Sequence, residues 1–178
     1  MIRPFGWNEF LIIVMAAQWT IALSAIAFAG GGIGGLLIAL ARVSEIRPLR
    51  LAALGFIRVF QGTPLLMQLF LVFFGMNIFG LPINPWIAAT LALTLHASAF
   101  LGEIWRGCIE AVAPGQREAA TALGLKYYNR MCYIVLPQAA RIAVAPTVGF
   151  LVQLIKGTSL AAIIGFTELT RQGQIINN

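Results

Sequence analysis

The chain of 178 residues has the length of a single domain, and 60% of its residues are hydrophobic while only 10% are charged. Soluble domains are about half apolar and about a quarter charged, so this composition excludes an ordinary soluble protein and indicates one embedded in a membrane. The net charge of +6 is spread between apolar runs and forms no single patch, which argues against a nucleic-acid partner.

A first membrane span is predicted in the charge-free run of residues 10–41, which exceeds the ~20 apolar residues that a bilayer core requires. We place the span itself at about residues 17–41. The glycine-rich segment Gly30–Gly35 lies inside it. Because small residues let helix backbones approach closely in lipid, these glycines indicate packing against a neighbouring helix more than a ligand site.

A basic, exposed connector is predicted at residues 42–58, where four arginines surround one glutamate. The next charge-free run, residues 59–102, is too long for one helix, and the Gly and Pro residues of segment 77–85 predict a turn within it. This run and the few residues after it therefore predict two further spans, at about residues 64–79 and 86–105.

A polar connector occupies residues 106–137, and a fourth span is predicted at about residues 138–155. The segment after Lys156 is too short and too polar for a clear span, so we expect an interfacial or re-entrant helix with a polar tail. The two cysteines, Cys108 and Cys132, have neither zinc-ligand nor redox-pair spacing, and no metal site is implied.

The polar connector contains signals for two short helices. Pro114 and Gly115 predict a turn that starts a helix near Gln116, with Glu118 in its first turn. Gly124 is placed to cap that helix at its C-terminus before a second helix begins. Pro137 then marks the boundary with the fourth span.

The first of these helices has two interpretations on physical grounds alone. Its alanines, Ala119, Ala120 and Ala122, leave a thin face that would fit a groove in another protein. Alternatively it is a solvated helix that only connects two spans, since many connectors contain alanine-rich helices.

Topology follows from the basic residues, because nine of the twelve lysines and arginines lie in residues 42–58 and 106–141. The positive-inside rule places both connectors in the cytoplasm, so the N-terminus lies outside and the chain crosses the membrane four times.

The polar connector carries a resemblance to a known family. The sequence Glu118-Ala119-Ala120, then Gly124, then Leu136-Pro137 resembles the EAA loop of permease subunits in bacterial ABC importers. The segments at 60–70, 100–125, 136–143 and 158–174 are similar to members of its polar amino acid uptake branch. The resemblance covers nearly the whole chain from the first span onward.

The resemblance implies an all-α, polytopic helical bundle with the type I ABC importer permease fold in the bacterial inner membrane. It implies that the chain translocates a polar or charged amino acid delivered by a periplasmic or lipid-anchored solute-binding protein. The partners implied are a second identical or similar permease and two ATP-binding subunits. The loop 116–136 would couple to the ATPase subunit through Glu118, Ala119, Ala120, Gly124, Leu136 and Pro137.

We expect no ATP hydrolysis by this chain, because it contains no GxxxxGK[ST] phosphate loop. The resemblance implies a translocating subunit that is not an enzyme and has no cofactor of its own. The resemblance implies that ATP and Mg²⁺ are bound by the partner subunits. Family members usually have a further span after the Gly-Thr-Ser-Leu segment, so four spans are expected here with a fifth missing. Gly157 stands where an aspartate is common and His96 where an asparagine is common, so the relatives' substrate preference does not transfer.

Five residues are candidates for the substrate pathway: His96, Ser98, Glu103, Thr158 and Ser159. An ionisable group such as His96 is costly inside a membrane and so indicates function, although a neutral histidine in an interhelical hydrogen bond is an equal alternative. Glu103 could meet a cationic amino acid or pair with Arg106. Thr158 and Ser159 could line the outer mouth or cap a helix.

Two rival functions follow from other classes. A membrane-embedded enzyme would need a catalytic constellation, but the chain has one histidine, no aspartate and no HExxH or GxSxG motif. A structural membrane protein would dock a cytoplasmic partner without transporting a solute.

Overall fold

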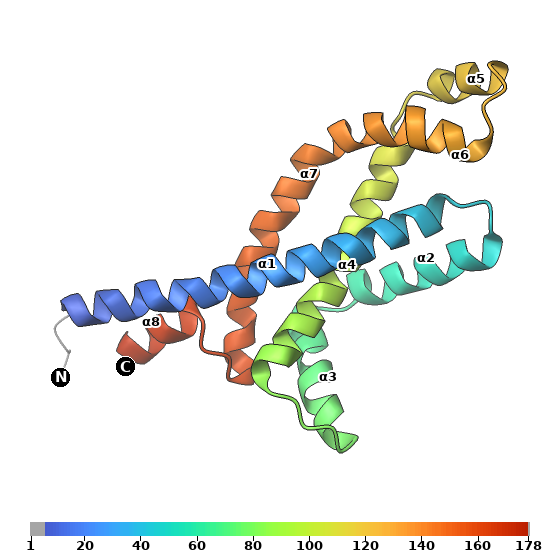
Figure 1. The fold of residues 1–178 in the computed structure, drawn as a ribbon. Helices are drawn as coiled ribbons and strands as arrows, with labels where there is room; N and C mark the ends of the chain where they lie inside the picture. The colour runs from blue at the N-terminus through green and yellow to red at the C-terminus, as the bar shows by residue number, and fades with distance from the viewer. Residues whose placement is uncertain (1–5, 178) are drawn as a thin grey trace.

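The computed structural model describes residues 6–177 (Figure 1). Residues 1–5 and 178, which the predicted domain includes, lie outside the described part. The described residues form helices joined by short turns, with no strand among them. In chain order the elements are α1 (Trp7–Val43), α2 (Arg47–Gly62), α3 (Leu65–Ile78), α4 (Pro85–Glu110), α5 (Pro114–Ala122), α6 (Tyr127–Arg130), the π-helical η1 (Met131–Val135), α7 (Leu136–Gly157), the 3₁₀-helical η2 (Thr158–Ile164) and α8 (Leu169–Asn177). The predicted all-α class is confirmed.

The crossing of α1 over α4 is the most extensive helix pairing in the described part of the chain (Figure 1). Gly31 and Gly35 are both buried at this crossing. A Cβ atom on Gly35 would lie 2.8 Å from the Cβ of Leu101, and one on Gly31 would overlap Ala97. The predicted packing role of the glycine-rich segment is therefore confirmed, because a larger side chain would force the two helices apart.

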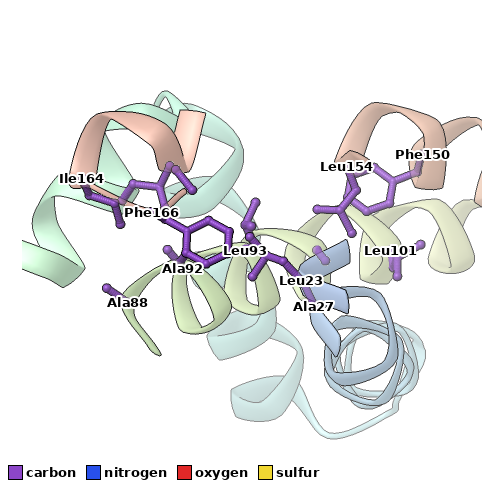
Figure 2. Close-up of a cluster of buried hydrophobic side chains, with 14 residues drawn as sticks. Leu23, Ala27, Ala88, Ala92, Leu93, Leu101, Phe150, Leu154, Ile164 and Phe166 are labelled. Atoms are coloured by element: carbon purple, nitrogen blue, oxygen red, sulfur yellow. The ribbon is translucent and has the colours of Figure 1, made fainter. Parts of the chain in front are cut away.

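The main core joins α1, α4 and α7 with the segment that follows them (Figure 2). Leu23 from α1 and Leu93 from α4 are fully buried there, and Phe150 from α7 is 4% exposed. Ile164 and Phe166 close one end of the cluster. Burying such side chains contributes roughly 1.5–3 kcal/mol each relative to water, although in lipid shape complementarity between the helices matters more.

The second predicted span has different bounds in the structure. Residues 65–78 form α3, whose 14 residues rise only about 21 Å, less than the ~30 Å of a bilayer core. α2 precedes it at an angle of 102°, and only the bent pair together is long and apolar enough to cross. α2 lies where we predicted an exposed connector. Its leucines and alanines favour helix, and Pro48 is tolerated because it occupies the helix's first turn.

Three other helical runs are long and apolar enough to cross a membrane: Trp7–Val43, Pro85–Glu110 and Tyr127–Ile164. The last of these contradicts the predicted boundary at Pro137, because the helix continues through the proline without a break. Pro137 has no N–H, and its ring would clash with a carbonyl in a regular α-helix. The π-helical turn Met131–Val135 directly before it provides a wider local geometry that admits the ring.

Candidate coupling loop and translocation site

The candidate coupling loop begins with α5, which lies with α6 beyond the ends of α4 and α7 (Figure 1). Pro114 is itself the first helical residue, so the helix starts two residues earlier than we predicted. Glu118 consequently lies in the second turn, and no acidic residue is in the first. The predicted position of Glu118 in the first turn is therefore wrong, and its carboxylate does not lie where it would complement the helix dipole.

Gly124 ends α5 as predicted. Its φ angle is +76°, a left-handed conformation that strains other residues. The N–H of Gly124 donates to the carbonyl of Thr121 at 2.9 Å, and the N–H of Leu125 donates to the carbonyl of Ala120 at 3.0 Å. These two bonds form a Schellman motif, which satisfies the last helix carbonyls and reverses the chain at one residue.

The small-residue face of α5 is divided between the protein and the outside. Ala120 is 2% exposed and faces its own chain, whereas Glu118 and Ala119 are exposed. Leu123, the residue before the glycine, is 81% exposed. A large apolar side chain that is exposed beside a fixed turn is a candidate contact for a partner. The sequence interpretation missed it, because the sequence alone does not show that this leucine stays exposed.

Polar contacts attach the loop to the bundle. The Arg117 guanidinium donates to the carbonyl of Ile109 near the end of α4. Arg130 donates to the Thr121 hydroxyl at 2.7 Å, which ties α6 to α5. These contacts hold α5 in a defined place relative to α4.

Leu136 and Pro137 do not belong to the exposed face of α5. Leu136 is half-buried and packs against a second cluster formed by Ala39, Ile109, Val135 and neighbours. Pro137 is exposed at the start of α7. Of the six predicted coupling residues, only Glu118, Ala119 and Gly124 are exposed together on the loop.

His96 lies in the middle of α4 and is 8% exposed. Its Nδ1 atom is 3.1 Å from Oε1 of Gln68 on α3. Its ring packs against Phe100 at 4.4 Å between centroids, with Phe150 of α7 at 6.4 Å. The interhelical hydrogen bond that we considered for a neutral histidine is present, and it joins the α2–α3 bend to α4.

Ser98 and Glu103 are engaged within the fold. The Ser98 hydroxyl donates to the Thr94 carbonyl at 2.8 Å, and it faces Gly34 of α1. Glu103 accepts two hydrogen bonds from Arg106, at 2.7 and 2.9 Å, and Arg106 also pairs with Glu110. Both residues therefore have structural partners, and for Glu103 the partner is Arg106, as the second interpretation of that residue predicts.

Thr158 and Ser159 lie where α7 passes into the 3₁₀ turn. Their hydroxyls donate to the carbonyls of Ile155 and Lys156 at 2.7 and 2.8 Å. Thr158 is fully buried. Both hydroxyls thus bond to the end of the preceding helix and do not cap a following one.

Glu168 is a functional candidate that the sequence interpretation missed. It is 1% exposed, and its carboxylate accepts from the N–H groups of Thr170 and Arg171 at 3.0 and 2.9 Å. The Thr20 hydroxyl of α1 lies 3.5 Å from the same carboxylate and accepts from the Leu169 N–H at 3.2 Å. A glutamate directly before a polar helix was the available signal.

Helices long and apolar enough to cross a membrane, with a polar loop fixed beyond one end, define the class as a helical membrane protein. A family model described as "Binding-protein-dependent transport system inner membrane component" matches residues 31–178. The chain belongs to this family and is a membrane-spanning permease subunit of an ABC importer.

Two relatives illustrate the similarity. The chain is 38% identical over 169 residues to the "Probable amino-acid ABC transporter permease protein YckA" of Bacillus subtilis, covering 95% of this chain and 75% of that relative. It is 36% identical over 172 residues to the "Glutamine transport system permease protein GlnP" of Escherichia coli, covering 96% and 78% respectively.

Solved structures agree with this assignment. One described as an amino acid ABC transporter with histidines superposes with a TM-score of 0.91 at 37% identity, over 95% of this chain and 79% of that one. An inward-facing MetNI methionine ABC transporter gives a TM-score of 0.80 at 20% identity, which shows the shared fold. The fold is the type I ABC importer permease fold.

Proposed function

We propose that this permease translocates a polar or charged amino acid delivered by an external solute-binding protein, and that separate ATP-binding subunits drive it. Relatives named as permeases for glutamine and for L-cystine support an amino acid substrate. ATP and Mg²⁺ are assigned to the partner subunits, and this chain supplies the path and the coupling surface. A second permease subunit, identical or similar, completes the path.

The observation that carries the coupling assignment is the fixed turn at Gly124. α5 is held to the bundle by Arg117 and Arg130, yet Glu118, Ala119 and Leu123 remain exposed on it. A short helix that is rigidly attached and open on one face can transmit a push from a partner to α4 and α7. We therefore place the ATPase contact on α5 and its Gly124 turn, with Leu136 and Pro137 carrying the movement into α7.

The orientation with the N-terminus outside is part of the same proposal. The Tyr127 hydroxyl donates to the Val43 carbonyl, so the two basic connectors meet at one end of the bundle. Basic residues concentrated at one end favour the cytoplasmic side for that end. α5 then lies in the cytoplasm, where an ATPase subunit can reach it.

Five residues remain candidates for the substrate pathway, and they differ in whether a polar atom is left without a hydrogen-bond partner. His96 keeps one ring nitrogen without a partner in residues 6–177, whereas Ser98, Glu103, Thr158 and Ser159 each have a hydrogen-bond partner in the fold. We propose His96 as the principal substrate contact and the other four as residues that shape the path.

Replacing Gly124 tests the coupling assignment. Gly124→Leu imposes a left-handed strain of roughly 1–2 kcal/mol, which is relieved by displacing the turn. In proteoliposomes with the ATPase and binding protein, we expect uptake of labelled amino acid to fall at least about tenfold. The matched control is Gly80→Leu, since Gly80 has the same φ angle of +76° and open space around it but lies in the turn before α4, outside the loop.

The unfolding temperature and helical content of the permease should change little in either variant. Normal uptake by Gly124→Leu would contradict the coupling role. If the substrate-loaded binding protein did not change the ATPase activity of the wild-type complex, the alternative function would be favoured, in which the chain docks a partner without transporting a solute.

A further inference from the structure

A buried polar pair connects the bend between α2 and α3 to the middle of α4. Gln68 is 6% exposed and His96 is 8% exposed, and both come from segments expected within the membrane. Apolar residues surround them, so each polar atom of the pair requires a partner. The hydrogen bonds of Gln68 determine which atoms His96 can use.

The orientation of the Gln68 amide follows from its neighbours. Its Nε2 atom lies 2.7 Å from the Phe60 carbonyl and 3.0 Å from the Thr63 carbonyl. Carbonyl oxygens only accept hydrogen bonds, so the amide nitrogen has to face them. The Thr63 hydroxyl is also near the nitrogen, at 3.0 Å, but its own proton goes to the Val59 carbonyl. The amide oxygen therefore faces His96.

The amide oxygen in turn determines the tautomer of His96. Oε1 of Gln68 can only accept, so Nδ1 of His96, 3.1 Å away, carries the ring proton. In a neutral imidazole the other nitrogen, Nε2, is then an acceptor with a free lone pair. Within residues 6–177, Nε2 has no hydrogen-bond partner. Three side-chain atoms in the described residues are fully enclosed and lack a hydrogen-bond partner: Arg42 Nε, Thr90 Oγ1 and Arg117 Nε. Nε2 of His96 is not one of them, so it is not fully enclosed by the fold.

The surroundings of His96 carry no free carboxylate. Phe100 and Phe150 flank the imidazole, and α3 contains no ionisable residue. On α4, Glu103 and Glu110 share the guanidinium of Arg106, so both carboxylates are already paired. On α7, the ionisable groups are Arg141, near one end of the helix, and Lys156, near the other. Gly157 approaches Leu65 of α3 and adds no charge.

We infer that Gln68 holds His96 with Nε2 as a hydrogen-bond acceptor for an uncharged N–H or O–H group of the transported amino acid. This rests on the proposed function. A carboxylate side chain would place its acceptor atoms against the acceptor Nε2. An ammonium or guanidinium would be desolvated without a compensating carboxylate. The transported class is therefore amino acids with an amide or hydroxyl side chain, with His96 as a specificity-determining residue and Gln68 as its positioning residue.

The tautomer can be observed directly, because the chain contains one histidine. Permease with ¹⁵N-labelled histidine, assembled with unlabelled ATPase subunits in nanodiscs, gives one pair of imidazole nitrogen signals. We expect the two-bond ¹H–¹⁵N coupling pattern of a neutral ring protonated at Nδ1. A ring protonated at Nε2 would overturn the inference, as would a doubly protonated ring.

The substrate class is tested by binding to the same complex. Labelled glutamine, glutamate and lysine are the probes, and His96→Asn and His96→Phe are the variants. Loss of one uncharged hydrogen bond predicts that His96→Phe weakens glutamine binding about tenfold, while His96→Asn, which keeps an acceptor, loses less. Gln153→Leu is the matched control, because Gln153 is exposed on α7.

Each outcome decides one point. Wild-type binding of lysine or glutamate as strong as that of glutamine would contradict the inference. Unchanged glutamine binding in His96→Phe would also contradict it. So would a complex that imports amino acids normally but binds none of glutamine, glutamate and lysine. Failure of the wild-type transporter to import any amino acid, with its binding protein present, would instead refute the proposed function. Addition of glutamine should also shift the His96 nitrogen signals, which a purely structural histidine would not show.

Discussion

The hydroxyl of Tyr127 donates a 2.9 Å hydrogen bond to the backbone carbonyl of Val43 and so joins α6 to the end of α1. The contact spans 84 positions in the sequence. α1 in turn packs along α4 through its glycines. We therefore expect a movement of the candidate coupling loop to reach α1 as well as the helices on either side of the loop.

Removing this hydrogen bond should weaken the coupling of ATP hydrolysis to uptake more than it lowers the stability of the fold. Tyr127→Phe deletes one hydrogen bond, which contributes about 1 kcal/mol to stability. We expect the permease to remain folded but to import less amino acid per ATP hydrolysed. Uptake and phosphate release measured in the same proteoliposomes give that ratio. Tyr133→Phe is the control, since Tyr133 is 72% exposed. An equal ratio in both variants would show that the contact is not used in coupling.

The close crossing of α1 and α4 predicts a sharp difference between two glycines. Gly31→Ala places a methyl group against Ala97, whereas Gly55→Ala on α2 meets nothing within 4 Å. We expect Gly31→Ala to lower the unfolding temperature in detergent, because overpacking costs about 1–3 kcal/mol. Gly55→Ala should leave it unchanged or raise it, since alanine favours helix by up to about 1 kcal/mol. If Gly55→Ala lowered the unfolding temperature more than Gly31→Ala, then α1 and α4 would be able to move apart without loss of stability.

The exposed leucine beside the Gly124 turn predicts a partner contact. Leu123→Ala removes an apolar side chain that is 81% exposed, so it should hardly alter the permease alone. Truncating a central apolar contact typically costs more than about 1 kcal/mol, or roughly fivefold to tenfold in affinity. Titration of the ATPase subunit into nanodiscs containing the permease measures this. Leu81→Ala is the matched control, because Leu81 is 57% exposed in the turn before α4.

Local signals were sufficient for several features of the fold. The Gly30–Gly35 segment predicted close helix packing because only small residues permit it, and Gly124 predicted a helix cap because the left-handed conformation favours glycine. Both signals come from glycine itself, which lacks a Cβ atom. The lengths of the apolar runs predicted the spans, and the resemblance to the permease family implied the all-α class.

Features that depend on distant partners could not be predicted from the sequence. Pro137 looked like a helix boundary because proline usually ends a helix. The sequence did not show the π-helical turn Met131–Val135, which lets the helical run from Tyr127 continue through the proline. Arginines made α2 look like a connector, although Ala53 and Ile57 give it a buried side. The orientation of Gln68 toward His96 needs the 102° bend that places the end of α2 beside it.

The buried carboxylate of Glu168 predicts a measurable link between α8 and α1. Glu168→Gln keeps the shape but removes the charge that two backbone N–H groups and the Thr20 hydroxyl face. Hydrogen bonds to a charged group contribute roughly 1.5–3 kcal/mol, so we expect α8 to detach more often. Thr20→Val removes the partner on α1, and the double variant should lose less than the sum of the two single losses, because the residues share one network. Protease cleavage at Arg171, which is exposed, reports the detachment. Strictly additive effects would show that α8 is held by its own cap alone and not through α1.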